Sequence, residues 1–147
     1  MNKKPNIFAW LSLIVLQLIT CNLLLTTAVF ASDWDDYQKS GHKNSKWDSY
    51  VEAGFSSFEN GNMGTAEMFL QRAVARGCND GLVYIKIGFY YEAQKNYKKA
   101  INYLKKAYQK LPAQYPNAET TKLMAESLGR ILVLTGDLNA SESYLQK

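Results

Sequence analysis

The clearest pattern in this chain is an apolar stripe that repeats at steps of three or four residues. Its members between residues 97 and 111 are Tyr97, Ala100, Ile101, Leu104, Ala107, Tyr108 and Leu111. This spacing places all of their side chains on one face of an α-helix. Polar and charged residues fill the other positions, so we predict an amphipathic helix with one solvated side.

Shorter stripes predict further helices upstream. Val51, Phe55 and Phe58 recur at steps of four and three residues, and Leu82, Ile85 and Phe89 follow similar steps. Asn-Gly-Asn at residues 60–62 and Lys-Asn at residues 95–96 are residues that favour turns between helices. The pattern therefore predicts an all-α fold built from antiparallel helix pairs.

These helix pairs recur with a period of 34 residues. Residues Tyr50, Gly54, Ala66, Leu70 and Ala73 are followed 34 positions later by Tyr84, Gly88, Ala100, Leu104 and Ala107. A third unit follows with a shift of 41, which aligns Gly88 with Gly129 and Leu104 with Leu145. We assign the seven extra residues to a loop around residues 112–116, because Pro112 and Pro116 disfavour helix there.

The best-preserved unit reads Tyr84-x2-Ile87-Gly88-x2-Tyr91, then Ala100-x3-Leu104, then Ala107 and Pro112. It resembles the tetratricopeptide repeat, and the spacing of residues 73–81 also resembles the Sel1-like variant. The resemblance implies a short α-solenoid with about three repeats, at residues 47–80, 81–114 and 122–147, the last one partial. It also implies that Tyr84, Tyr91 and Leu104 are framework core.

The N-terminal region differs from the repeats. Residues 1–31 have a basic start, an uncharged stretch from Ile7 to Phe30 and small residues at Val29 and Ala31, as expected of a secretory signal peptide. The stretch is also long enough for an uncleaved membrane anchor. A third option is lipidation at Cys21, because residues 18–21 loosely resemble a bacterial lipobox. We expect residues 32–46 to be a flexible lead-in, with Trp34 and Tyr37 available for docking.

The resemblance implies that the first helix of each pair lines a concave groove for a protein partner. The groove residues would be Val51, Phe55, Phe58, Leu82, Ile85, Phe89 and Arg130. Apolar side chains of this kind bind an extended or helical segment by burial. The alternative is that they pack on one another, or on Trp34 and Tyr37 of the lead-in.

The charge of the chain is uneven. The formal net charge is +4, and removal of Lys3 and Lys4 with a leader would leave fifteen basic against thirteen acidic residues, or +2. Residues 81–112 hold seven lysines and one acid. A possible basic surface consists of Lys98, Lys99, Lys105, Lys106 and Lys110. It is either an ordinary solvated helix face or a contact for an acidic protein or anionic lipid, and we expect no nucleic-acid partner.

Few residues could support catalysis. His42 is the only histidine, and Cys78 is the only cysteine that would remain after cleavage of residues 1–31. Neither has metal-ligand spacing or a catalytic partner in the sequence, and no glycine-rich phosphate loop is present. We therefore expect no enzyme, no cofactor and no metal site, with Cys78 buried as a small hydrophobe.

The sequence predicts a non-catalytic protein-binding scaffold in a bacterial cell envelope, either periplasmic or anchored in the inner membrane by its N-terminal segment. The alternative is a structural subunit of an envelope complex that acts through the basic surface. Ile131, Leu134, Leu138 and Leu145 could leave an apolar end exposed, because repeat arrays normally cover their last unit. Self-association through that end is a further hypothesis.

Overall fold

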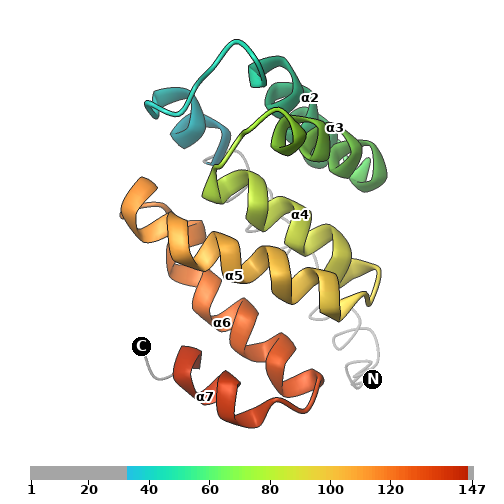
Figure 1. Cartoon of the computed structure of the whole chain (residues 1–147), viewed down its shortest axis with the longest axis vertical. Coiled ribbons are helices and arrows are strands. Elements are labelled where there is room, and N and C mark those ends of the chain that lie inside the picture. Colours follow the sequence, from blue (N-terminus) through green and yellow to red (C-terminus); the bar gives the residue numbers. More distant parts are fainter. Residues whose placement is uncertain (1–32, 146–147) are drawn as a thin grey trace, which may run out of the picture.

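The computed structural model describes residues 33–145 as a stack of helices (Figure 1). The helices are α2 (Asp48–Glu59), α3 (Met63–Ala75), α4 (Gly81–Ala93), α5 (Tyr97–Gln114), α6 (Glu119–Leu134) and α7 (Leu138–Leu145), preceded by a helix at residues 33–39. No strand occurs within residues 33–145, which confirms the predicted all-α fold. The predicted leader at residues 1–31 lies outside this range.

The helices form three consecutive pairs, α2 with α3, α4 with α5 and α6 with α7. Two glycines allow the first two pairs to pack closely. A Cβ atom built on Gly54 would lie 2.5 Å from Leu70 Cδ2, and one built on Gly88 would lie 2.6 Å from Leu104 Cδ2. The period of 34 residues thus reproduces one glycine–leucine contact in successive repeats, as expected for a short α-solenoid.

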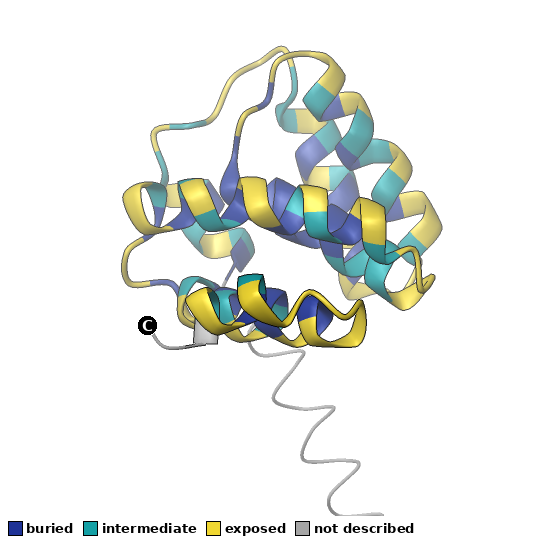
Figure 2. Ribbon diagram, turned by 60° about the horizontal axis from the view of Figure 1, so that its bottom comes forward, coloured by how far each residue is buried: buried dark blue, intermediate teal, exposed yellow. Residues whose placement is uncertain are grey.

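Helix α4 is the centre of the described stack. All residues from 81 to 88 are buried, because α5 and α3 pack against this helix and α6 and residues 33–39 also contact it. Figure 2 shows the buried residues gathered where helices face one another and the exposed residues on their outer sides. None of the helices in residues 33–145 combines the length and apolarity required to cross a bilayer.

Pro112 departs from the predicted loop, because it lies inside α5. Leu111 beside it is fully buried, and the Tyr115 amide donates to the Leu111 carbonyl at 2.7 Å. Gln114 Oε1 also accepts from the Gly81 amide at 2.8 Å, which ties the last turn of α5 to the start of α4. These contacts continue the helix past the proline, and the loop comprises residues 115–118 instead.

Residues 33–39 also differ from expectation, since they form a helix instead of a flexible segment. Tyr37 is fully buried, and its ring lies 6.0 Å from that of Phe55. The Trp34 ring lies 5.6 Å from the same phenylalanine. Burial of these two aromatic side chains against α2 stabilises a segment whose acidic composition alone would favour solvent.

Candidate partner-binding site

The predicted groove residues divide into a covered set and an accessible set. Five of them are buried, namely Val51, Phe55, Phe58, Leu82 and Ile85. Phe89 is half-buried on α4, and Arg130 is exposed on α6, where its guanidinium pairs with Glu92. The structure therefore brings the apolar stripes of α2 and α4 together, but as covered surface.

Residues 33–39 cover the part of this surface around Phe55 and extend to Lys86 and Thr120. We name this covered part the first-helix face. We define it by Phe55 and Phe58 on α2, Lys86 on α4 and Thr120 on α6. Trp34 and Tyr37 pack on the Phe55 ring, as the alternative interpretation of the sequence anticipated. The lead-in therefore lies on the first helix of each of the three pairs.

A buried ion pair anchors the start of this helix. Lys86 Nζ lies 3.1 Å from Asp33 Oδ2, and both side chains are only 1% exposed. The Thr120 hydroxyl donates to the other carboxylate oxygen of Asp33. Lys86 Nζ also lies 4.7 Å from the ring centres of Phe55 and Phe58. Asp33 thus links α4 to α6 through one carboxylate.

Burial sets the protonation properties of this pair. It raises the pKa of the Asp33 carboxyl above its ordinary value, and the positive charge of Lys86 opposes that shift. Burial likewise lowers the pKa of the Lys86 ammonium, and the negative charge of Asp33 opposes it. Each charge is therefore costly in this site without the other.

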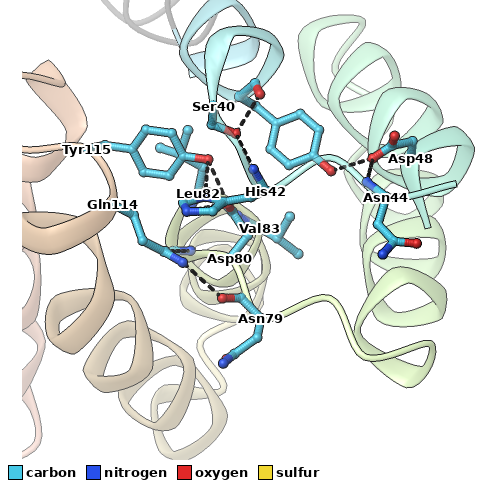
Figure 3. A network of polar contacts seen from close by, with 12 residues as sticks. Ser40, His42, Asn44, Asp48, Asn79, Asp80, Leu82, Val83, Gln114 and Tyr115 are labelled. Carbon is cyan, nitrogen blue, oxygen red and sulfur yellow. Dashed lines mark hydrogen bonds and ion pairs between the residues drawn. The ribbon is translucent and has the colours of Figure 1, made fainter. Parts of the chain in front are cut away.

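A second cluster holds the C-terminal side of the lead-in, as Figure 3 shows. Asp80 is buried, and its Oδ1 accepts from the Leu82 amide at 2.8 Å, so that it caps the N-terminus of α4. Its Oδ2 lies 2.6 Å from the Tyr115 hydroxyl and 2.9 Å from His42 Nδ1. An ionised carboxylate only accepts, so both neighbours donate to it. We call Asp80, His42 and Tyr115 the latch.

The latch is a structural hydrogen-bond cluster. Burial, followed by the charge of Asp80, raises the pKa of the Tyr115 phenol, which remains a protonated donor. Tyr37 makes a parallel connection, because its hydroxyl donates to Asp48 Oδ1 at 2.8 Å. These bonds join the lead-in to α2, to the start of α4 and to the end of α5.

A pocket of about 320 Å³ lies beside the latch and is lined by His42, Trp47, Cys78, Asp80 and Gln114 among others. Burial raises the pKa of the Cys78 thiol to about 12, so thiolate is scarce at neutral pH. Within residues 33–145 no group of three or more histidine, cysteine or acidic residues is placed to hold a metal ion. The Cys78 thiol in this pocket is therefore not activated as a nucleophile.

The five lysines of the predicted basic surface all lie on α5. Lys98, Lys99, Lys105 and Lys106 are exposed, and Lys110 is half-buried. Lys99 Nζ lies 4.8 Å from the ring centre of Tyr91, and Lys106 Nζ lies 5.3 Å from that of Tyr103. Part of this surface therefore covers aromatic rings of the second repeat.

The apolar C-terminal end is smaller than expected. Leu134 and Leu138 are 59% and 62% exposed, but Ile131 is fully buried within the core. The side chain of Leu145 lies outside the described residues. The prediction that Ile131 belongs to an exposed apolar end is therefore wrong, because its side chain on α6 lies in the core.

The residues that hold the lead-in escaped the sequence predictions. Lys86 is the only charged residue between Gly81 and Tyr91, and a lone cation in an apolar run signals a buried anion. Asp80 directly before a helix is an N-cap signal. No local pattern indicated that Asp33 and Thr120, 87 positions apart, share one hydrogen bond.

The comparisons with known proteins agree with the repeat architecture. Residues 82–109 match the family model described as tetratricopeptide repeat, and this range covers α4 and much of α5. The chain therefore contains a tetratricopeptide repeat within a short helical-repeat solenoid. Repeats of this family generally mediate protein–protein interaction. Neither the search of curated proteins nor the search of solved structures found a match.

Proposed function

We propose that this chain is a non-catalytic protein-binding module whose first-helix face receives a helical segment of a partner. One observation carries the proposal: a helix, residues 33–39, already lies on that face and makes aromatic, ionic and hydrogen-bonded contacts there. Burial of one large apolar side chain contributes about 1.5–3 kcal/mol. Two such side chains and a paired carboxylate are contacts of the kind by which a groove recognises a helical segment.

Accessible apolar side chains on α4 and α6 offer a first contact for a partner. Phe89 on α4 is half-buried, whereas Leu123 and Val133 on α6 are 40% and 45% exposed. The Arg130–Glu92 ion pair joins α6 to α4. Accessible apolar side chains together with charged ones are a usual composition for the edge of a protein interface.

We further propose that the module acts in a bacterial cell envelope, either released into the periplasm or held at the inner membrane by its N-terminal segment. The basic start, long uncharged stretch and small residues near Ala31 support export. The mature N-terminus, measured by mass spectrometry, distinguishes a cleaved leader from a retained anchor.

Site-specific crosslinking in the native cell tests the function. A photoreactive amino acid at Phe89 or Arg130 should capture a partner protein that mass spectrometry identifies. The matched control places the same group at Lys98 or Lys105 on α5. Capture from α5 alone would contradict the proposal and would favour the second candidate below.

The second candidate is a structural subunit that contacts an acidic partner or membrane through the basic surface. The observation in its favour is the row of exposed lysines on α5. Reversing the charge of Lys98 and Lys105 would then abolish association with the envelope. Such binding would also weaken strongly between low and high salt, because exposed charges are screened.

A further inference from the structure

The helix at residues 33–39 carries a definite chemical pattern. Asp33 provides a carboxylate at its start, Trp34 follows at the next position and Tyr37 lies four positions after Asp33. Asp33 contacts Lys86 and Thr120, whereas both aromatic rings contact Phe55. The carboxylate and the two aromatic rings thus contact different residues of the first-helix face, with the rings sharing Phe55.

The first-helix face is complementary to this pattern. Its only cation among the defining residues is Lys86, which lies over the rings of Phe55 and Phe58. A buried ammonium is stabilised by an anion beside it, and Asp33 supplies one at 3.1 Å, with a smaller contribution from the charge of Glu59. The face is therefore complementary to a segment that places one carboxylate next to aromatic side chains.

The connection between this helix and α2 is short and largely exposed. Residues 43–46 are exposed, as is Gly41, whereas His42 is 34% exposed and joins the latch through Asp80. At its C-terminal side the lead-in is held only by this exposed loop and by the bonds of His42 and Tyr37. Its release as a unit also requires the Asp33 ion pair and the aromatic packing on Phe55 to break.

We propose that residues 33–39 are the resident occupant of a recognition site, and that the partner inserts a helical segment with the same pattern. That segment carries a carboxylate, an aromatic residue at the next position and a second aromatic residue at the fourth position after it. The inference rests on the proposed function and adds the chemistry of the partner. Because the resident helix competes, the apparent association constant of the partner equals the intrinsic constant multiplied by the fraction of molecules with an open face.

A labelled peptide tests this chemistry by fluorescence anisotropy. The probe is a synthetic peptide of residues 33–46, titrated against the full chain and against its Tyr37→Ala variant. The substitution weakens the resident helix and leaves the defining residues of the face intact. We expect the probe to bind the variant about tenfold more tightly than it binds the native chain.

A matched probe carries Asp33→Asn and should bind the variant about tenfold more weakly than the native probe, because it lacks the carboxylate that pairs with Lys86 at 3.1 Å. Equal binding of the probe to both chains, with unchanged helical circular dichroism, would overturn the inference. If the Tyr37→Ala chain lost its helical circular dichroism, the His42→Ala chain would be titrated with the same probe instead. His42→Ala loosens only the latch, so we expect the probe to bind this chain about threefold more tightly than the native chain. Unchanged affinity of the probe for the His42→Ala chain would overturn the inference.

The outcomes separate this inference from the proposed function. If crosslinking at Phe89 captures a partner and the probe does not bind, the function stands and the partner pattern is wrong. If the probe binds the variant and no partner is captured, the pattern is right and the function is wrong. A native dimer in light scattering that the probe dissociates would overturn a separate partner and assign the occupant to a second copy.

Discussion

Among residues 33–145, Lys95 is the only residue other than glycine with a left-handed backbone, at φ of 56°. Gly61 and Gly136, at φ of 75° and 82°, occupy the equivalent turns of the other two helix pairs. A side chain in this conformation costs about 1–2 kcal/mol, which glycine avoids. The turn of the best-preserved repeat is therefore the strained one.

We expect Lys95→Gly to stabilise the chain by up to about 1 kcal/mol, because it removes that strain at an exposed turn. Urea denaturation of the native and variant chains measures the change. The control is Gly61→Lys, which should lower the free energy of unfolding by a similar amount, because it introduces the same strain. A Lys95→Gly chain less stable than the native one would contradict the account of this turn.

Asp80 is the second position with a sharp expectation. Asp80→Ala removes the cap of α4 and leaves the Tyr115 hydroxyl without its acceptor, and we expect a loss of roughly 2–4 kcal/mol. Asp80→Asn keeps an oxygen for the Leu82 amide and should lose less than half as much. Thermal denaturation monitored by circular dichroism compares them, and equal losses would disprove the capping role.

Cys78 gives a prediction for pH. Its thiol has a pKa of about 12 in the folded chain against an ordinary value of 9.0, since burial disfavours the thiolate. The unfolded chain releases the proton first as pH rises, so this group's contribution to stability is complete below pH 9 and is lost between pH 9 and 12. From pH 8 to pH 10 the native chain should lose about 1 kcal/mol more than Cys78→Ala in denaturant unfolding.

At the scale of elements, the buried ion pair determines how the lead-in is held. Lys86→Met leaves the Asp33 carboxylate buried without a counter-ion, and we expect a loss of about 3–5 kcal/mol. The double variant Asp33→Asn with Lys86→Met removes both charges, and it should recover most of the free energy of unfolding that Lys86→Met alone loses. A double-mutant cycle by urea denaturation measures the coupling, and additive losses would show that the two side chains do not interact.

The helix pairs could be predicted from the sequence because their signals are local. The stripe from Tyr97 to Leu111 and the contact of Gly88 with Leu104 both lie within one repeat. Pro112 could not be placed, because tertiary contacts of Leu111 and Gln114 override its local preference. Tertiary structure, not local propensity, determines where α5 ends.

The candidate site was predictable only in part. Phe55 and Ile85 were identified by their stripe, but a stripe cannot show whether a face is open or covered. Covering depends on Asp33, which is 53 positions from its partner Lys86, and an acidic segment reads locally as solvated. The aromatic residues Trp34 and Tyr37 pointed to an occupant only as an alternative, and the lone lysine of α4 was a second signal in the sequence.

At the scale of the whole molecule, the lead-in completes the stack. Residues 33–39 contact the first helices of all three helix pairs, whereas each pair otherwise contacts mainly the pair next to it. We therefore expect release of residues 33–39 to lower the cooperativity of unfolding of the stack. Under the proposed function, recognition of a partner and stability of the array would depend on the same contacts.

The central claim is that residues 33–39 occupy the first-helix face. Nuclear Overhauser effects between the rings of Trp34 or Tyr37 and that of Phe55, recorded on the full chain in solution, test it most directly. The account predicts these cross-peaks, together with slow amide exchange at Tyr37. Random-coil shifts for residues 33–39 without such cross-peaks would contradict it.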